Sequence, residues 1–196
     1  MNKLLITIGF FIMLAAQWYV PGIMIYDQEA ALTEGTAYKF KTQPIDPNDP
    51  FRGKYVWLNY EMESVKSTDS VWGYKEPVYV YIRTGSDGYA EATEVSKVLL
   101  DTDQDYVKAD AGYYHNKEVY FELPFDRFYM EESKALDAEI GIRRTQLAMR
   151  DSLAPVCYAL VYVKGDIAVL DNVFIGTVSV KEFVEKEQAD EASKRR

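Results

Sequence analysis

The residue types best suited to covalent chemistry are a single cysteine and a single histidine. Cys157 lies in the apolar run 155–163, and His115 lies in the predicted turn Gly112–Asn116. A nucleophilic thiol needs an activating base, and a thiol in apolar surroundings behaves as a small apolar side chain. We therefore predict that Cys157 is buried and inert. No second His or Cys stands at metal-ligand spacing, so His115 is predicted to be an exposed loop residue.

Three aspartates at alternate positions resemble the opening of a calcium loop. Asp101, Asp103 and Asp105 could point their oxygens at one cation. An EF-hand loop also needs glycine at its sixth position and glutamate at its twelfth, where this chain has Tyr106 and Gly112. We therefore predict a solvated acidic turn and no metal site, with the three aspartates as the candidate ligands if a cation binds.

The polar stretch 64–70 suggests one possible function, that of a hydrolase with a catalytic Ser–Lys pair. Ser64, Lys66 and Ser67 follow a predicted strand, and signal peptidases are β-domains that use a Ser–Lys pair. The Ser-Met-X-Pro motif of those enzymes is absent, and no base is positioned by the sequence. The chain also lacks a phosphate loop, a dinucleotide fingerprint, a zinc pattern and a Gly-X-Ser-X-Gly elbow. No catalytic residue and no cofactor are predicted.

The stretch Asp46–Glu61 (DPNDPFRGKYVWLNYE) is the segment around which the chain is organised. Its two Asp-Pro steps favour extended backbone, and Gly53 allows a bend. A strand over residues 54–62 follows. Alternation predicts one face toward the core (Val56, Leu58, Tyr60, Met62) and one face away from it (Tyr55, Trp57, Asn59, Glu61).

Two interpretations of this bend remain open. In the first, Arg52 and Lys54 present charge beside Tyr55 and Trp57, which together form a candidate binding surface. In the second, which is favoured, Gly53 makes a tight turn and the aromatic and aliphatic residues of the strand serve packing.

The octapeptide Gly53–Tyr60 (GKYVWLNY) resembles the signature of the GDYXXLXY-domain proteins, a bacterial family named for that octapeptide. The matching positions are Gly53, Tyr55, Leu58 and Tyr60, whereas Lys54 stands where the family has aspartate. Residues 44–52 are similar to the leader that precedes this signature in the family, and the C-terminal half is also similar. The resemblance implies a membrane-tethered extracytoplasmic domain that often occurs with a polytopic membrane protein. It implies no established reaction.

Residues 4–26 are predicted to anchor the chain in a membrane. The segment is apolar and has 23 residues, enough to cross a bilayer core of about 30 Å as a helix. Lys3 precedes it and Asp27 follows it, so the positive-inside rule predicts a cytoplasmic N-terminus and an extracytoplasmic domain at the cytoplasmic (inner) membrane. A cleaved signal peptide and a buried core helix are the alternatives, although Leu14-Ala15-Ala16 is a poor cleavage site.

Composition and periodicity predict a mostly β (α+β) fold. The chain is divided into an anchor (1–26), a β-rich domain (27–184) and a charged, flexible tail (185–196). We expect a β-sandwich or an open β-barrel with one packed α-helix, over residues 130–150. Residues 27–35 continue the anchor helix, and further strands are expected at 37–42, 77–84, 89–100, 106–109, 117–123, 156–163, 167–170 and 173–180, with a turn at 86–88, a hairpin at 164–166 and a bulge or turn at 171–172.

Three classes of function are compatible with this organisation. The favoured one is an accessory or interaction protein that acts by protein contacts, with a polytopic membrane protein as a candidate partner. The alternatives are an envelope hydrolase and a sensor that binds a small molecule or glycan on Tyr and Trp rings. Nucleic acid is not an expected partner, because the net charge is −9.

Overall fold

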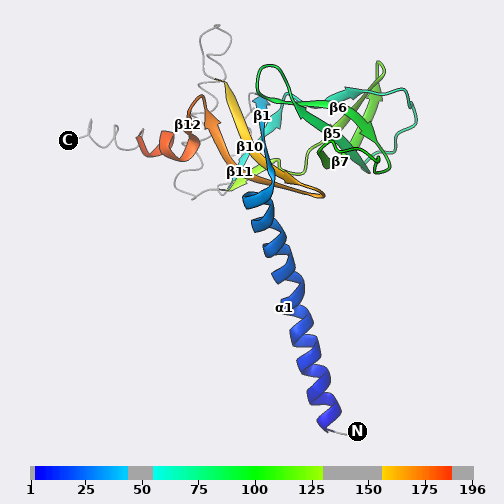
Figure 1. Ribbon diagram of the computed structural model, residues 1–196, viewed down its shortest axis with the longest axis vertical. Helices are drawn as coiled ribbons and strands as arrows, with labels where there is room; N and C mark the ends of the chain where they lie inside the picture. The colour runs from blue at the N-terminus through cyan, green and yellow to red at the C-terminus, as the bar shows by residue number, and fades with distance from the viewer. Residues whose placement is uncertain (1–2, 44–54, 130–155, 187–196) are drawn as a thin grey trace, which may run out of the picture.

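The structure is a computed structural model that describes residues 3–43, 55–129 and 156–186. A long helix, α1 (Lys3–Glu34), projects from one side of a β-rich domain (Figure 1). The described strands are β1 (Thr36–Gln43), β2 (Tyr55–Trp57), β3 (Asn59–Tyr60), β4 (Ser64–Lys66), β5 (Glu76–Thr84), β6 (Ala90–Ser96), β7 (Tyr106–His115), β8 (Glu118–Glu122), β9 (Arg127–Tyr129), β10 (Cys157–Lys164), β11 (Ile167–Ile175) and β12 (Val178–Ser179).

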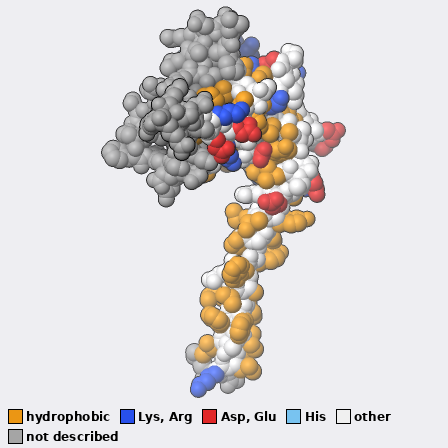
Figure 2. Space-filling model, turned by 90° about the vertical axis from the view of Figure 1, so that its left-hand side faces the viewer, with side chains coloured by type: hydrophobic (Ala, Val, Ile, Leu, Met, Phe, Trp, Pro, Cys, Tyr) orange, Lys and Arg blue, Asp and Glu red, His pale blue; other side chains and the backbone are white. Residues whose placement is uncertain are grey.

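Among the described residues, α1 is the one helix that is long and apolar enough to cross a membrane. Pro21 lies inside the helix and does not end it, as is common in membrane-spanning helices. Figure 2 shows apolar side chains along its length, with a basic side chain near the free end and acidic side chains where it meets the domain. The helix passes without a break through the predicted boundary at residue 26.

The predicted helical continuation over residues 27–35 is confirmed, and it joins α1 firmly to the domain. The Gly35 N–H donates a hydrogen bond to the Ala31 carbonyl at 2.9 Å, and Ala31 is fully buried. Lys164 at the tip of the β10–β11 hairpin pairs with Glu34 at 2.5 Å. A side chain at residue 35 would meet the Ala31 oxygen at 2.3 Å, so glycine is required at this junction.

The strands form two antiparallel five-stranded sheets and a two-stranded ribbon. The first sheet has the order β12-β11-β10-β1-β3, the second has the order β4-β8-β7-β5-β6, and β2 pairs with β9. The sheets enclose one continuous hydrophobic core in a nearly closed, barrel-like arrangement. The predicted mostly β fold is confirmed, in its open-barrel form.

Alternation along each strand explains why this core forms. In β10, Cys157, Ala159, Val161 and Val163 are buried while the residues between them are only partly covered. Strand β10 pairs with β1 on one side and β11 on the other. The predicted hairpin at 164–166 and the irregularity at Asp171 are both present, since the β10–β11 register shifts there.

Two expected elements are wrong in detail. The predicted turn Gly112–Asn116 is strand up to His115, and the chain reverses at Asn116 and Lys117, whose φ angles are 53° and 66°. Cross-strand pairing of His115 with Glu118 extends β7 beyond what local sequence indicates. The predicted strand 173–180 is divided at Gly176 (φ 62°), where the chain doubles back into β12.

The predictions for the C-terminal part of the chain can be compared with the structure only in part. The predicted packed helix over residues 130–150 lies outside the described residues. Residues 180–186 form a short helix instead of a strand end, and Val180 and Val184 bury their side chains in the core. Of the charged tail, only residues 185 and 186 are described, and both are helical.

Polar pairs close the seam between the two sheets. Tyr38 on β1 donates a hydrogen bond to Asp105, next to β7, at 2.9 Å. From the second sheet, Tyr106 and Lys108 both bond to Asp166 in the β10–β11 hairpin, the lysine at 2.6 Å. These contacts join residues that are about 60 positions apart in the chain.

Because of Tyr38 at this seam, we expect the folded protein to lose stability at alkaline pH. Burial, and then the hydrogen bond to Asp105, raises the pKa of Tyr38 to about 12, whereas an unfolded tyrosine titrates near 10. Between these values the unfolded state releases a proton that the folded state keeps, so stability falls as pH rises from about 10 to 12. In Tyr38→Phe, the urea midpoint of the full chain in detergent should fall less steeply over that range than in the wild type. An unchanged slope would contradict this assignment.

Candidate functional site

The signature strand borders the candidate site. Of the predicted binding surface, Arg52 and Lys54 lie outside the described residues, as does Gly53 of the signature, and Tyr55 is described only by its backbone pairing with Tyr129. Trp57 is 37% exposed. The Arg127 guanidinium lies 5.1 Å from its ring centre.

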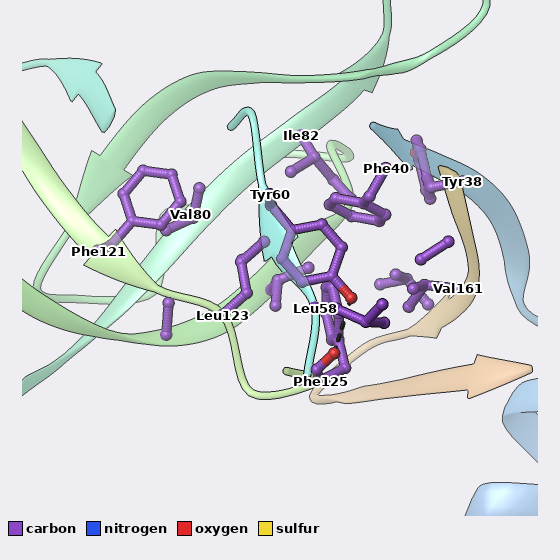
Figure 3. Close-up of a cluster of buried hydrophobic side chains, with 14 of the residues drawn as sticks. Tyr38, Phe40, Leu58, Tyr60, Val80, Ile82, Phe121, Leu123, Phe125 and Val161 are labelled. Atoms are coloured by element: carbon purple, nitrogen blue, oxygen red, sulfur yellow. Dashed lines mark hydrogen bonds between the residues drawn. The ribbon is translucent and has the colours of Figure 1, made fainter. Parts of the chain in front are cut away.

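The predicted core face of this strand is confirmed where side chains are described. Leu58 and Tyr60 are buried, whereas Trp57 and Asn59 are exposed. Leu58 lies between β2 and β3, and its N–H donates to the Asp126 carbonyl at 2.7 Å. The Tyr60 hydroxyl donates to the Phe125 carbonyl at 2.7 Å, in the buried cluster of Figure 3. Two signature residues therefore have a packing role.

A cleft of about 390 Å³ lies beside this strand. Its walls come from the signature strand, β8, the β7 bulge, the loop before β5 and the loop before β9. The lining residues are Trp57, Leu58, Asn59, Tyr60, Met62, Glu63, Tyr74, Gly112, Tyr113, Tyr120, Phe121, Glu122, Leu123 and Asp126. Within the described ranges, the cleft therefore combines aromatic rings with carboxylates.

A β-bulge shapes one wall of the cleft. The β7–β8 register shifts between Ala111 and Tyr114, so Gly112 and Tyr113 together face Tyr120. Bulges of this kind redirect side chains. Tyr113 stacks on Tyr120 with ring centres 4.3 Å apart, yet Tyr113 remains 61% exposed. Tyr74, on the loop before β5, is 77% exposed. Sequence reasoning missed these tyrosines, because only the tertiary fold brings the β7 bulge and the loop before β5 to the cleft that Trp57 also lines.

The cleft carries unbalanced negative charge. Glu63 and Glu122 are exposed, and among the described residues neither carboxylate has an ion-pair partner. Asp126 is half-buried and lies 3.7 Å from Arg127. The arrangement suits a ligand that offers positive charge and a flat or aliphatic surface.

The candidates for nucleophilic catalysis lie outside this cleft. Ser64 donates its hydroxyl hydrogen bond to Glu118 at 2.9 Å, and the Ser67 hydroxyl accepts one from the Asp69 N–H. Lys66 and His115 are both exposed. In the part of the chain that the structure describes, no serine hydroxyl or cysteine thiol is hydrogen-bonded to a lysine or histidine side chain.

The three aspartates of residues 101–105 are not arranged as a ligand set. Asp105 accepts the hydrogen bond from Tyr38 at the sheet seam, and Asp101 and Asp103 are exposed on the loop before β7. Across the described segments, no group of three or more His, Cys, Asp or Glu side chains is placed to hold a metal ion.

The thiol of Cys157 should resist modification in the folded protein. It is fully buried, and burial raises its pKa to about 11, so the reactive thiolate is scarce at neutral pH. We expect a maleimide to leave the native chain unlabelled at pH 7.5 and to label one site in urea, as read by mass spectrometry. Rapid labelling of the native chain would contradict a buried thiol.

The fold defines the class: a barrel-like antiparallel β-domain carried on one N-terminal helix that is long and apolar enough to cross a membrane. The model of the GDYXXLXY protein family matches residues 17–170, and the chain belongs to that family. This confirms the resemblance of the signature strand. The comparisons with curated proteins and with solved structures found no match.

Proposed function

We propose that the protein is a membrane-anchored, extracytoplasmic accessory protein that acts by binding another protein. Its α1 helix holds it in the cytoplasmic membrane, and the cleft beside the signature strand is its contact site. The partner is a polytopic membrane protein in the same bilayer.

The observation that carries this proposal is the set of exposed aromatic rings in the cleft. Tyr and Trp are enriched at protein interfaces, because their rings bury much apolar area at little entropic cost. Trp57, Tyr74 and Tyr113 expose their rings together around one cavity, in a protein whose Phe40, Tyr60 and Phe125 are buried. A cavity of about 390 Å³ suits one side chain or a short segment of a partner.

The stem between anchor and domain supports a partner in the same membrane. Residues 27–34 are helical and continuous with the apolar segment, and they span about 12 Å at about 1.5 Å per residue. Contacts of Ala31 and Glu34 with the domain make this stem rigid rather than a loose tether. The domain would therefore be kept close to the bilayer, within reach of the extramembrane loops of a neighbour.

The hydrolase alternative is less well supported. The described walls of the cleft contain no Ser, Thr, Cys, His or Lys side chain. Elsewhere in the described residues, the Ser64 hydroxyl is bonded to the Glu118 carboxylate outside the cleft, and the Cys157 thiol is buried in the core.

Site-specific photo-crosslinking in the native membrane tests the proposed function. A benzophenone amino acid at position 74, in the cleft, should yield a discrete adduct with an integral membrane protein, identified by mass spectrometry. The same group at position 94, exposed on strand β6 at the far edge of the second sheet, is the matched control and should yield none. Absence of an adduct at position 74, or equal adducts at both positions, would refute the proposal.

A further inference from the structure

We infer that the cleft binds a cationic side chain, a lysine or arginine of the partner segment, between the Tyr113–Tyr120 pair and the carboxylates of Glu63 and Glu122. This inference rests on the proposed function and specifies the chemistry that the partner must present.

The surface of the protein shows how its own cations interact with rings and carboxylates. Four times among the described residues, a cation lies 4.8–5.9 Å from an aromatic ring centre and 2.6–3.7 Å from a carboxylate oxygen. The sets are Lys41 with Tyr89 and Asp87, Lys97 with Trp72 and Glu76, Lys108 with Tyr79 and Asp166, and Arg127 with Trp57 and Asp126. Ring and carboxylate act together here, since both attract positive charge.

The cleft has the aromatic rings and the carboxylates of this pattern, but its described lining residues include no cation. It offers the stacked rings of Tyr113 and Tyr120 and the carboxylates of Glu63 and Glu122. No Lys or Arg is found among its described lining residues. Lys75 lies 5.8 Å from the ring centre of Tyr74, but no cation is found over the Tyr113–Tyr120 pair in the described part of the chain. The described residues therefore supply no cation at this ring pair, and we expect the ligand to bring one.

Aromatic rings alone could bind several classes of ligand. The charge of the cleft distinguishes between these classes. An anion would meet Glu63 and Glu122, and the net charge of −9 adds to that repulsion. A neutral sugar could stack on the tyrosines but would leave the negative charge of two carboxylates without a counter-charge. A lysine or arginine can lay its aliphatic stem on the rings and bring its charged end to the carboxylates.

Calorimetric titration of the full chain in neutral detergent micelles provides the test. The probes are the capped peptide Ala-Lys-Ala, its counterpart with an Nε-acetylated lysine, capped Ala-Arg-Ala, and N-acetylglucosamine trimer. We expect saturable binding of the lysine and arginine peptides, weakened by salt. Binding of the acetylated peptide should be about tenfold weaker, because the charge is lost while the stem remains.

Exposed-surface variants assign the binding to the cleft. The double variant Glu63→Gln/Glu122→Gln and the variant Tyr113→Ala should each weaken lysine-peptide binding by about threefold to tenfold. Glu94→Gln, which removes an exposed carboxylate on strand β6, should bind like the wild type.

Several outcomes would overturn the inference. These are equal binding of the lysine and acetyl-lysine peptides, binding unaffected by the double variant, no peptide binding, or binding of the sugar trimer alone. The crosslinking experiment separates the two proposals. An adduct at position 74 that persists in the double variant would refute the cationic ligand and leave partner binding standing. Peptide binding without any adduct at position 74 would refute partner binding and leave the cationic ligand standing.

Discussion

Replacing Phe40 by alanine is expected to lower the free energy of unfolding by about 3–5 kcal/mol, because it opens a cavity where three aromatic rings meet. Phe40 is 1% exposed. Its ring packs edge-on against Phe125 and Tyr60, with centres 5.0 Å and 6.0 Å away, and those two rings are themselves 5.4 Å apart (Figure 3). Thermal unfolding of the full chain in detergent, followed by near-ultraviolet circular dichroism, should show a midpoint lower by about 6–20 °C.

Two control variants separate cavity formation from the mere loss of an aromatic ring. Phe40→Leu retains most of the volume and should cost less than about 1.5 kcal/mol. Tyr74→Ala removes an exposed ring and should change stability by no more than about 0.5 kcal/mol. If all three variants unfold at one temperature, the aromatic cluster does not stabilise the barrel.

This cluster also shows what the sequence predicts well. Alternation alone indicates that Leu58 and Tyr60 point inward and Trp57 and Asn59 outward, because successive side chains of a strand lie on opposite faces. The structure confirms this even though the strand is interrupted at Leu58. Gly165, at positive φ, likewise marks the tight β10–β11 turn that the sequence predicts.

Non-local pairing limits prediction. The alignment of Phe40 with Ala159 joins strands separated by more than a hundred residues, and no local pattern specifies it. The same limitation applies to the cleft, where the β7 bulge, the loop before β5 and the signature strand converge. The sequence therefore placed Trp57 in a candidate binding surface but gave no reason to associate it with Tyr74 or Tyr113.

The other large effect is expected from substitutions in α1 that weaken its insertion into the membrane. Ile12 and Leu14 lie near the middle of the apolar part of α1, and their exchange for arginine adds about 2.5–3.5 kcal/mol each to the cost of membrane insertion. We expect the wild-type chain to stay with membranes in alkaline carbonate and to dissolve only in detergent. Most of the Ile12→Arg/Leu14→Arg chain should instead be recovered without detergent or be degraded. Gln28→Arg in the stem should behave like the wild type, and extraction of the wild type by carbonate would refute anchoring by α1.

Orientation can be read in the same membranes, because the one native cysteine is buried. A new cysteine at Glu94, an exposed position, gives a reporter against the silent background of Cys157. If Lys3 stays in the cytoplasm, as the positive-inside rule predicts, Glu94→Cys should react with a membrane-impermeant maleimide in right-side-out vesicles. In inverted vesicles it should react only after detergent is added. The opposite pattern would put the cleft in the cytoplasm, where a partner would have to be sought on that side of the bilayer.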